Sequence, residues 1–244
     1  GSVGFNGTTG TKVPVFHPLL TNTAPMLAGV KRHYKRIGRD VTALAIAGDG
    51  GASDVGFQSL SGAAERNEQI LFMVVDNEGY MNTGAQKSSS TPHYAKTGST
   101  PAGKLTRKKN LTEIMAAHGV PYVATASAGH MADLTRKLAK AKSMRGTRLL
   151  TLLIPCLDGW GVADDMGLAA ARLAVETGAF PLVEVEHGER WTVNSAKTRP
   201  IGDYLAVQRR YRHLGAEQIS ALQDEIDAGW ARLQRLAALN DTPV

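Results

Sequence analysis

The chain of 244 residues contains a single cysteine, Cys156, and this scarcity excludes an intrachain disulfide framework. A chain without disulfides suits a reducing compartment, so we expect a cytoplasmic protein. No stretch approaches the 18 or so consecutive apolar residues needed to cross a bilayer. The segment GSVGFNGTTG at residues 1–10 lacks the charged and apolar parts of a signal peptide. The sequence therefore predicts no membrane association.

The signals of a nucleic-acid-binding protein are also missing. The net charge of +6 is modest, and most basic residues lie in helical segments such as VKRHYKRIGR. We find no zinc-ligand spacing, no RNA-binding signature and no basic strip interleaved with aromatic residues. Hydrophobic residues (43%) and charged residues (20%) occur at ordinary globular levels. We therefore expect a folded domain with no nucleic-acid partner.

Four short, continuously apolar runs predict the strands of the domain. Such runs are typical of parallel strands that are covered on both faces. Segments with helical periodicity alternate with them, which predicts a doubly wound α/β domain with a mostly parallel sheet. The expected strands are TALAIA (42–47), LFMVVD (71–76), VPYVATA (120–126) and LLTLLIP (149–155), and the expected helices cover 23–36, 53–67, 110–119, 130–143 and 167–178.

The chain changes character after Pro181. A short strand, LVEVE, is followed by a polar stretch and then by a long helical pattern over 216–239. We predict an α/β domain at residues 1–187 and a largely helical C-terminal extension at 188–244.

A long segment without periodicity, Thr83 to Lys109, follows the second expected strand. Loops of this length are uncommon in compact domains, and they are usually functional or disordered. The segment would leave the sheet at its carboxyl edge, where open α/β folds bind ligands. We expect a mobile covering loop, and the alternative is a disordered insertion.

The turn AGDGGAS at residues 47–53 has three possible interpretations. Gly48, Gly50 and Ser53 partly match a dinucleotide-binding fingerprint, which uses close backbone approach to a diphosphate. Alternatively, the turn is only a strand-to-helix connection with Asp49 as a turn residue. The third possibility is a site for a divalent metal and a diphosphate.

The segment DNEGYMNTG (76–84) favours the third interpretation. It closes the next expected strand, so Asp49 and Asn77 would lie at neighbouring strand ends. One carboxylate and one neutral carbonyl suit a hard cation such as Mg²⁺, with a backbone carbonyl, water and phosphates completing an octahedron. A nicotinamide site needs no second oxygen ligand of this kind.

GDG followed some two dozen residues later by Asn resembles the thiamine diphosphate motif, and the match extends over roughly residues 17–218. The chain resembles the β subunit of the 2-oxoacid:ferredoxin oxidoreductases, most closely that of pyruvate:ferredoxin oxidoreductase. The likeness is shown by GDGGASDVGFQSLSGAAERNEQILFMVVDNEGYMNTGAQKSSSTP, TPAGK, IMAAHGVPYVATAS, PCLDGW, ARLAVETGAFPLVEVEHG and PIGDYLAVQRRYRHL.

The resemblance implies a role for each matching residue of the two motifs. Asp49, Asn77 and the backbone carbonyl of Gly79 would bind Mg²⁺. Asn82 would lie beside the reactive thiazolium ring, and the alternative for this residue is a turn position. The residues implied in cofactor binding are Gly48, Asp49, Gly50, Gly51, Asn77, Gly79, Tyr80, Asn82 and Thr83.

The resemblance also implies that Cys156, in PCLDGW, ligates a [4Fe–4S] cluster. Without it, a lone cysteine after an apolar run would be interpreted as a buried core residue. A four-cysteine cluster needs three more ligands, which the family places upstream and which the 244 residues lack. We expect these ligands outside this sequence, in a missing N-terminal stretch; the alternative is a subunit with no complete cluster. Residues 1–15 match the pyruvate enzymes poorly, which leaves the substrate open.

The implied reaction is oxidative decarboxylation of a 2-oxo acid to an acyl-coenzyme A, with thiamine diphosphate as the electron sink. Electrons would pass through iron–sulfur clusters to ferredoxin or a similar acceptor. The partners implied are an α subunit that supplies the activating glutamate, and γ and δ-type subunits. Pyruvate is the leading substrate, and an aromatic or branched 2-oxo acid such as phenylglyoxylate is the rival.

Three other functions remain open: a non-oxidative thiamine diphosphate decarboxylase, a dinucleotide-binding dehydrogenase and a non-catalytic assembly subunit. The basic cluster LTRKK at 105–109 could meet phosphates of coenzyme A or an acidic electron-transfer partner. A solvated loop is the alternative for that cluster.

Overall fold

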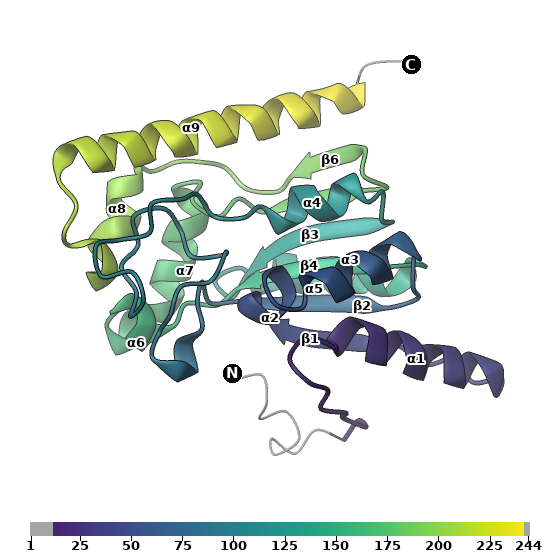
Figure 1. The fold of residues 1–244 in the computed structure, drawn as a ribbon. Coiled ribbons are helices and arrows are strands. Elements are labelled where there is room, and N and C mark those ends of the chain that lie inside the picture. Colours follow the sequence, from purple (N-terminus) through teal and green to yellow (C-terminus); the bar gives the residue numbers. More distant parts are fainter. Residues whose placement is uncertain (1–11, 242–244) are drawn as a thin grey trace.

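The computed structural model describes residues 12–241. Most of residues 1–15, which match the pyruvate enzymes poorly, therefore lie outside the described residues. The described chain forms a six-stranded sheet in the order β1-β2-β4-β3-β5-β6. The first four strands in this order run parallel, whereas β5 and β6 run antiparallel to their neighbours (Figure 1). The strands are β1 (Leu44–Gly48), β2 (Leu71–Asp76), β3 (Tyr122–Ser127), β4 (Arg148–Leu153), β5 (Val183–Glu186) and β6 (Arg190–Val193).

The predicted mostly parallel α/β sheet is confirmed. Strands β3 and β4 lie in the middle of the sheet and are buried at every residue, as their continuous apolar runs indicate. Strand β6 was not predicted, because its sequence RWTV alternates between exposed and buried residues at a sheet edge. Only Trp191 of this strand is buried in the core.

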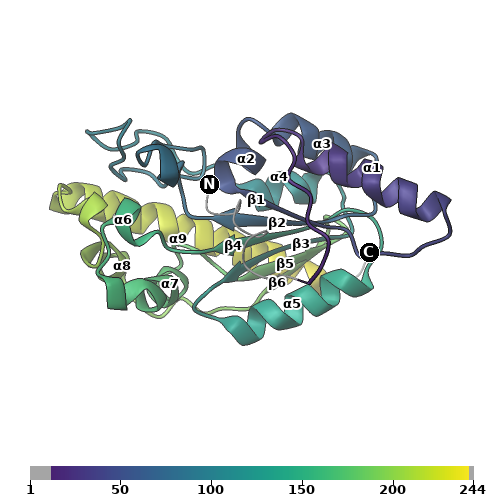
Figure 2. The same cartoon turned by 90° about the horizontal axis from the view of Figure 1, so that it is seen from below.

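The helices cover both faces of the sheet, as Figure 2 shows. The connections β1→β2 and β2→β3 advance across the sheet in one direction, and β3→β4 steps back. Because right-handed crossovers place the helix on a face set by this direction, α3 and α4 pack on one face and α5 packs on the other. The longer helices are α1 (Thr23–Arg36), α3 (Phe57–Glu65), α4 (Leu111–Ala117), α5 (Met131–Ser143), α7 (Gly167–Glu176) and α9 (Ala216–Ala238).

The helix expected over 53–67 is shorter in the structure, and a separate short helix precedes it. A short helix, α2 (Asp49–Ser53), begins at the aspartate of the glycine turn, and α3 follows at Phe57. At the break, a Cβ on Gly56 would lie 2.1 Å from the Gly51 carbonyl oxygen, so only glycine allows the two backbones to pass. The other short elements, which periodicity does not reveal, are α6 (Leu157–Trp160), α8 (Ile201–Ala206), η2 (Met81–Thr83), η3 (Asp164–Met166), η4 (Arg209–Tyr211) and η5 (Leu239–Asp241).

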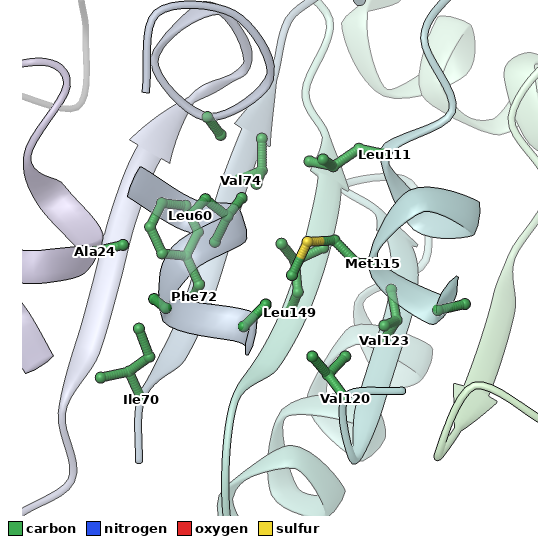
Figure 3. Close-up of a cluster of buried hydrophobic side chains, with 14 of the residues drawn as sticks. Ala24, Leu60, Ile70, Phe72, Val74, Leu111, Met115, Val120, Val123 and Leu149 are labelled. Atoms are coloured by element: carbon green, nitrogen blue, oxygen red, sulfur yellow. The ribbon is translucent and has the colours of Figure 1, made fainter. Parts of the chain in front are cut away.

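Two hydrophobic clusters connect the C-terminal residues to the sheet. The first lies between the sheet and helices α3 and α4, where Leu60, Phe72 and Met115 pack together (Figure 3). The second surrounds Trp160 beyond the carboxyl end of the sheet. Helix α9 contributes Leu233 to the first cluster and Leu222 to the second.

The expected division of the chain into residues 1–187 and 188–244 falls within paired structure. The boundary after residue 187 lies in the turn between the paired strands β5 and β6. As predicted, the residues beyond β6 are largely helical. Among residues 12–241 no helix combines the length and the apolar character required to traverse a lipid bilayer.

Candidate functional site

Three neighbouring strands end at the same edge of the sheet. The register pairs Gly48 of β1 with Val75 of β2, and Asp76 of β2 with Leu153 of β4. Asp49 and Asn77 therefore follow adjacent strand ends, and Cys156 follows the third a few residues later. This edge is where parallel α/β sheets bind ligands.

Oxygen atoms of Asp49, Asn77 and Gly79 converge at this edge. The side-chain amide position of Asn77 that is placed as oxygen lies 2.8 Å from the Gly79 carbonyl oxygen and 3.1 Å from Asp49 Oδ1. Two arrangements avoid the repulsion between these oxygens: the amide turns so that its nitrogen donates to both, or a cation lies among them. Octahedral Mg²⁺ with bonds of about 2.1 Å holds adjacent ligands about 3 Å apart. The two distances from Asn77 therefore match the spacing of adjacent ligands in a magnesium octahedron.

Asp49 lacks a basic partner. Its side chain is buried, and Oδ2 accepts a hydrogen bond from the Ser88 hydroxyl at 2.5 Å. Burial, together with the nearby Asp76 carboxylate, raises the pKa of Asp49 to about 7. Within residues 12–241 no lysine, arginine or histidine forms an ion pair with this carboxylate. A divalent cation would supply the missing positive charge.

The glycines of the turn differ in what surrounds them. A Cβ on Gly48 would meet nothing within 4 Å, which leaves open space beside Asp49. A Cβ on Gly50 would lie 2.2 Å from a ring atom of Tyr80, whose hydroxyl donates to the Gly50 carbonyl (3.3 Å) and to Asp54 (3.1 Å). Gly50 is thus required by internal packing, whereas Gly48 leaves room for a diphosphate to approach the backbone. Gly51 is enclosed, because a Cβ there would lie 3.1 Å from Leu20.

The residues after Gly79 form a tight loop with an exposed end. Tyr80 and Gln86 exchange two backbone hydrogen bonds of 2.9 and 3.2 Å, which close the loop. Asn82 and Thr83 are exposed in η2, and Thr83 bonds to the Gln86 side chain at 2.5 Å. Asn82 thus lies on the solvent-exposed part of this loop.

A buried charged network behind the loop was not predicted. Lys108 Nζ bonds to Asp76 (2.7 Å) and Glu78 (2.9 Å), and Arg210 Nη2 bonds to the other Glu78 oxygen at 2.5 Å. Although burial opposes it, the charges of Lys108 and Arg210 lower the pKa of Glu78. Asp76, which ends an apolar run, was the available sequence signal. Arg210 offered none, because 132 residues separate it from Glu78.

The basic cluster at 105–109 is accounted for by internal contacts. Lys108 bonds to the buried carboxylates, and Lys109 donates to the Ser53 carbonyl and lies 5.1 Å from the centre of the Phe57 ring. A solvated loop is therefore the wrong description for these two lysines. Their positive charges face the protein and not an external phosphate.

The segment from Thr83 to Lys109 covers the site as a compact loop and not as a disordered insertion. Lys104 is buried, and its ammonium donates to the backbone carbonyls of Ser89 (3.1 Å), Thr91 (2.5 Å) and Arg107 (3.2 Å). Burial lowers the pKa of Lys104 to about 8. The loop also supplies Ser88, the hydrogen-bond partner of Asp49.

Cys156 lies at the start of α6, half-buried, with its Sγ accepting from the Gly159 amide at 3.4 Å. The same helix is tied to the ligand loop, because Trp160 Nε1 donates to the Asn77 carbonyl at 2.8 Å. The described residues contain no group of three or more His, Cys, Asp or Glu side chains suited to a metal. Since the chain has one cysteine, a [4Fe–4S] cluster at Cys156 would need thiolates from elsewhere.

Two cavities lie behind this edge of the sheet, and neither includes the Gly48–Asp49 turn. One, of about 180 Å³, is lined by Asp76, Lys108 and the hydroxyls of Ser53 and Thr151, which have no protein partner. The other, of about 440 Å³, lies between α9 and the covering loop. The unpaired hydroxyls in the first cavity are suited to binding ordered water. The candidate site at the oxygen cluster thus lies outside both cavities.

Comparison with known proteins identifies both the domain and its relatives. Residues 4–152 match the family model described as "Thiamine pyrophosphate enzyme, C-terminal TPP binding domain". The chain is 57% identical over 235 residues to the β subunit of the NADH-dependent phenylglyoxylate dehydrogenase of Aromatoleum evansii. This match covers 93% of the chain but 53% of the relative, so the chain spans about half the length of that protein.

Further matches point in the same direction. The chain is 46% identical over 233 residues to pyruvate synthase subunit PorB of Methanocaldococcus jannaschii, covering 90% of the chain and 78% of the relative. A solved 2-oxoglutarate:ferredoxin oxidoreductase from Magnetococcus marinus shares the fold, with a TM-score of 0.54 and 19% identity over 82% of this chain and 72% of that chain.

Proposed function

This chain belongs to the thiamine diphosphate-binding β subunits of the 2-oxoacid oxidoreductases, and from that membership we propose its activity. It would be the cofactor-binding subunit of an enzyme that converts a 2-oxo acid and coenzyme A to an acyl-coenzyme A and carbon dioxide. The observation that supports this proposal most directly is the convergence of the Asp49, Asn77 and Gly79 oxygens at the carboxyl edge of the sheet.

Each residue of the site would have a defined task. Asp49, Asn77 and the Gly79 carbonyl would hold Mg²⁺, and Gly48 would let the diphosphate approach the backbone. Gly50, Gly51 and Tyr80 would fix the shape of the turn. Bound thiamine diphosphate would supply an electron sink for decarboxylation. Asn82 and Thr83, exposed in η2, would face the reactive end of the cofactor.

The chain would act only with partner subunits. An α subunit would supply the glutamate that activates the cofactor, and γ and δ-type subunits would complete the electron path. Cys156 would contribute one thiolate to a [4Fe–4S] cluster whose other ligands lie outside these 244 residues. The electron acceptor would be ferredoxin or a similar carrier, although the Aromatoleum evansii relative is named as NADH-dependent. A cytoplasmic location stays a prediction.

The substrate is the least constrained part of the proposal. The sequence motifs favour pyruvate, and one relative is a pyruvate synthase subunit. Identity is nevertheless higher to the phenylglyoxylate dehydrogenase subunit, at 57% against 46%. We therefore propose an aromatic 2-oxo acid as the first substrate to test and pyruvate as the alternative.

Cofactor content tests the proposal. The native assembly is purified without oxygen and extracted with acid, and thiamine diphosphate and iron are measured per copy of this chain. About one cofactor with several irons supports the oxidoreductase. Cofactor without iron indicates a non-oxidative decarboxylase and leaves Cys156 as a packing residue. No cofactor contradicts the proposal. A panel of 2-oxo acids on the same assembly then identifies the substrate.

A further inference from the structure

The residue between two of the metal-binding positions has an unusual backbone conformation. Glu78 lies between Asn77 and Gly79 and has φ of +66°, in the left-handed region that few non-glycine residues adopt. This conformation costs about 1–2 kcal/mol, so surrounding contacts must maintain it. Its consequence is that Asn77 and Gly79 present their oxygens to Asp49 while the Glu78 side chain points into the protein.

Every polar group of Glu78 has a partner. The backbone amide donates to Asp76 Oδ1 at 3.0 Å, and the backbone carbonyl accepts from the Thr91 hydroxyl at 2.7 Å. One carboxylate oxygen bonds to Lys108 and the other to Arg210. Glu78 is 4% exposed, and these four contacts hold its backbone and side chain in place.

Arg210 holds the loop at a second point through Trp160. Its guanidinium lies 4.1 Å from the centre of the Trp160 ring, a cation–π contact. Trp160 Nε1 in turn donates to the Asn77 carbonyl. Arg210 Nε also bonds to Gln208 Oε1 at 2.9 Å, which sets the plane of the guanidinium. One arginine of the C-terminal region therefore constrains the residues on both sides of the Asn77–Glu78 peptide.

We propose that Glu78 and Arg210 are positioning residues, which hold the backbone of residues 76–80 so that the Asn77 and Gly79 oxygens meet the spacing that Mg²⁺ requires. The proposal rests on the proposed function, because it assumes that a divalent cation binds Asp49, Asn77 and Gly79. Neither Glu78 nor Arg210 touches the cation or the cofactor.

A positioning role has a signature that a purely structural role lacks. Mg²⁺ demands near-ideal octahedral geometry at 2.0–2.1 Å, whereas Ca²⁺ accepts flexible geometry at 2.3–2.6 Å. Loosening the loop should therefore weaken Mg²⁺ binding much more than Ca²⁺ binding. A variant that only lowers the folded fraction would weaken both ions by the same factor.

The experiment uses the assembled enzyme with thiamine diphosphate present, and measures the dissociation constants of Mg²⁺ and Ca²⁺ by displacement of Mn²⁺. The variants are Glu78→Gln, which keeps the shape of the side chain, and Arg210→Lys, which keeps its charge. The control is Glu184→Gln. Glu184 is equally buried and bonds to two basic side chains, but it lies on β5, where it is paired with Ala124 of β3.

We expect Glu78→Gln and Arg210→Lys to raise the Mg²⁺ dissociation constant at least tenfold and that of Ca²⁺ less than threefold. Glu184→Gln should change neither. If the wild-type enzyme binds no metal with the cofactor, the proposed function fails. If the wild type binds Mg²⁺ and both variants keep its Mg²⁺-to-Ca²⁺ ratio, or if Glu184→Gln shifts that ratio equally, the positioning role is overturned.

Trp160→Phe provides a milder test in case Glu78→Gln does not fold. It keeps an aromatic ring for Arg210, removes the hydrogen bond to the Asn77 carbonyl and reduces the volume of a fully buried side chain. We expect a threefold or larger shift of the metal ratio in the same direction. An unchanged ratio in both Trp160→Phe and Arg210→Lys would also overturn the positioning role.

Discussion

Two buried carboxylates, Asp49 and Glu184, show opposite electrostatic solutions in one molecule. Both residues are almost fully buried: Asp49 is 1% exposed and Glu184 is 2% exposed. Glu184 accepts hydrogen bonds of 2.6–2.9 Å from the Tyr122 hydroxyl, Arg136 and Lys140. Burial alone would raise the pKa of Glu184, but these partners outweigh burial and lower the pKa to about 2. Asp49 has one hydroxyl partner, and burial raises its pKa to about 7.

The difference separates a carboxylate that is neutralised within the fold from one that we propose binds a ligand. The protein neutralises Glu184 with its own side chains. It leaves Asp49 uncompensated, at the edge where the Asn77 and Gly79 oxygens add further negative potential. Carboxylates with a raised pKa and no basic partner are frequent at functional sites, because the ligand completes the charge balance. The fold gives up stability at Asp49 to keep that position available.

Asp49→Ala should produce the largest effect on binding. It removes the only carboxylate ligand of the proposed magnesium site, so we expect the affinity for thiamine diphosphate with Mg²⁺ to fall at least 1000-fold, or about 4 kcal/mol. Titration calorimetry on the assembled enzyme measures this loss. Binding within tenfold of the wild type would remove Asp49 from the site.

Glu184→Gln should produce the converse result, a loss of stability without a loss of binding. Removing the charge leaves Arg136 and Lys140 without their buried partner, which should cost about 2–3 kcal/mol of unfolding free energy. Because the pKa of Glu184 is depressed, this contribution is present above about pH 4.5 and disappears as the pH falls toward 2. Denaturant unfolding at pH 7 and pH 3 measures the difference, and a change in cofactor affinity would contradict the comparison.

Asp49→Asn should stabilise the protein in the absence of metal. A carboxyl whose pKa is raised in the folded state loses stability as the pH rises from about 4 to about 7, because the unfolded chain releases the proton first. We expect the variant to be about 1–2 kcal/mol more stable than the wild type at pH 8, with a smaller gap at pH 5. Thermal unfolding in the presence of a chelator measures this difference in stability. With Mg²⁺ and thiamine diphosphate present, the wild type should become the more stable of the two proteins. A constant gap across this pH range would argue against an uncompensated charge.

Substitutions at Gly48 and Gly50 should have the smallest effects, but these effects should separate cofactor binding from stability. Gly48→Ala adds a methyl group to open space, so it should leave the melting temperature unchanged and weaken cofactor binding about tenfold, or about 1.4 kcal/mol. Gly50→Ala forces Tyr80 to move and should reduce both stability and binding. Melting curves and cofactor titrations on both variants are sufficient. Normal binding by Gly48→Ala would place the diphosphate elsewhere.

The sheet and the convergence of Asp49 with Asn77 could be predicted, because both depend on local signals. Continuous apolar runs identify buried parallel strands, and polar residues directly after them must lie at one edge. Helix α2 could not be predicted, since its sequence DGGAS has little intrinsic helix preference and is maintained by its surroundings.

The partners of the site residues escaped prediction for a related reason. Ser88 comes from a Ser/Thr-rich loop whose sequence has no period, and it reaches Asp49 across 39 positions. Arg210 reaches Glu78 across 132 positions. Contacts between residues so far apart in the sequence depend on the three-dimensional fold of the chain. No local pattern in a single sequence predicts them.

Because Glu78 and Arg210 are far apart in the sequence, the ribosome synthesises Glu78 well before the arginine that contacts it. A ribosome that adds about 5–20 residues per second makes Glu78 roughly 7–26 s before Arg210. During that interval β1, β2 and the glycine turn already exist, but the arginine contact that fixes residues 76–80 does not. The nascent chain thus passes through a stage in which the proposed metal-binding residues have been synthesised but the arginine that fixes them has not. For the proposed site, we expect cofactor loading to depend on synthesis of the chain as far as Arg210, so that a product truncated before η4 binds the cofactor weakly.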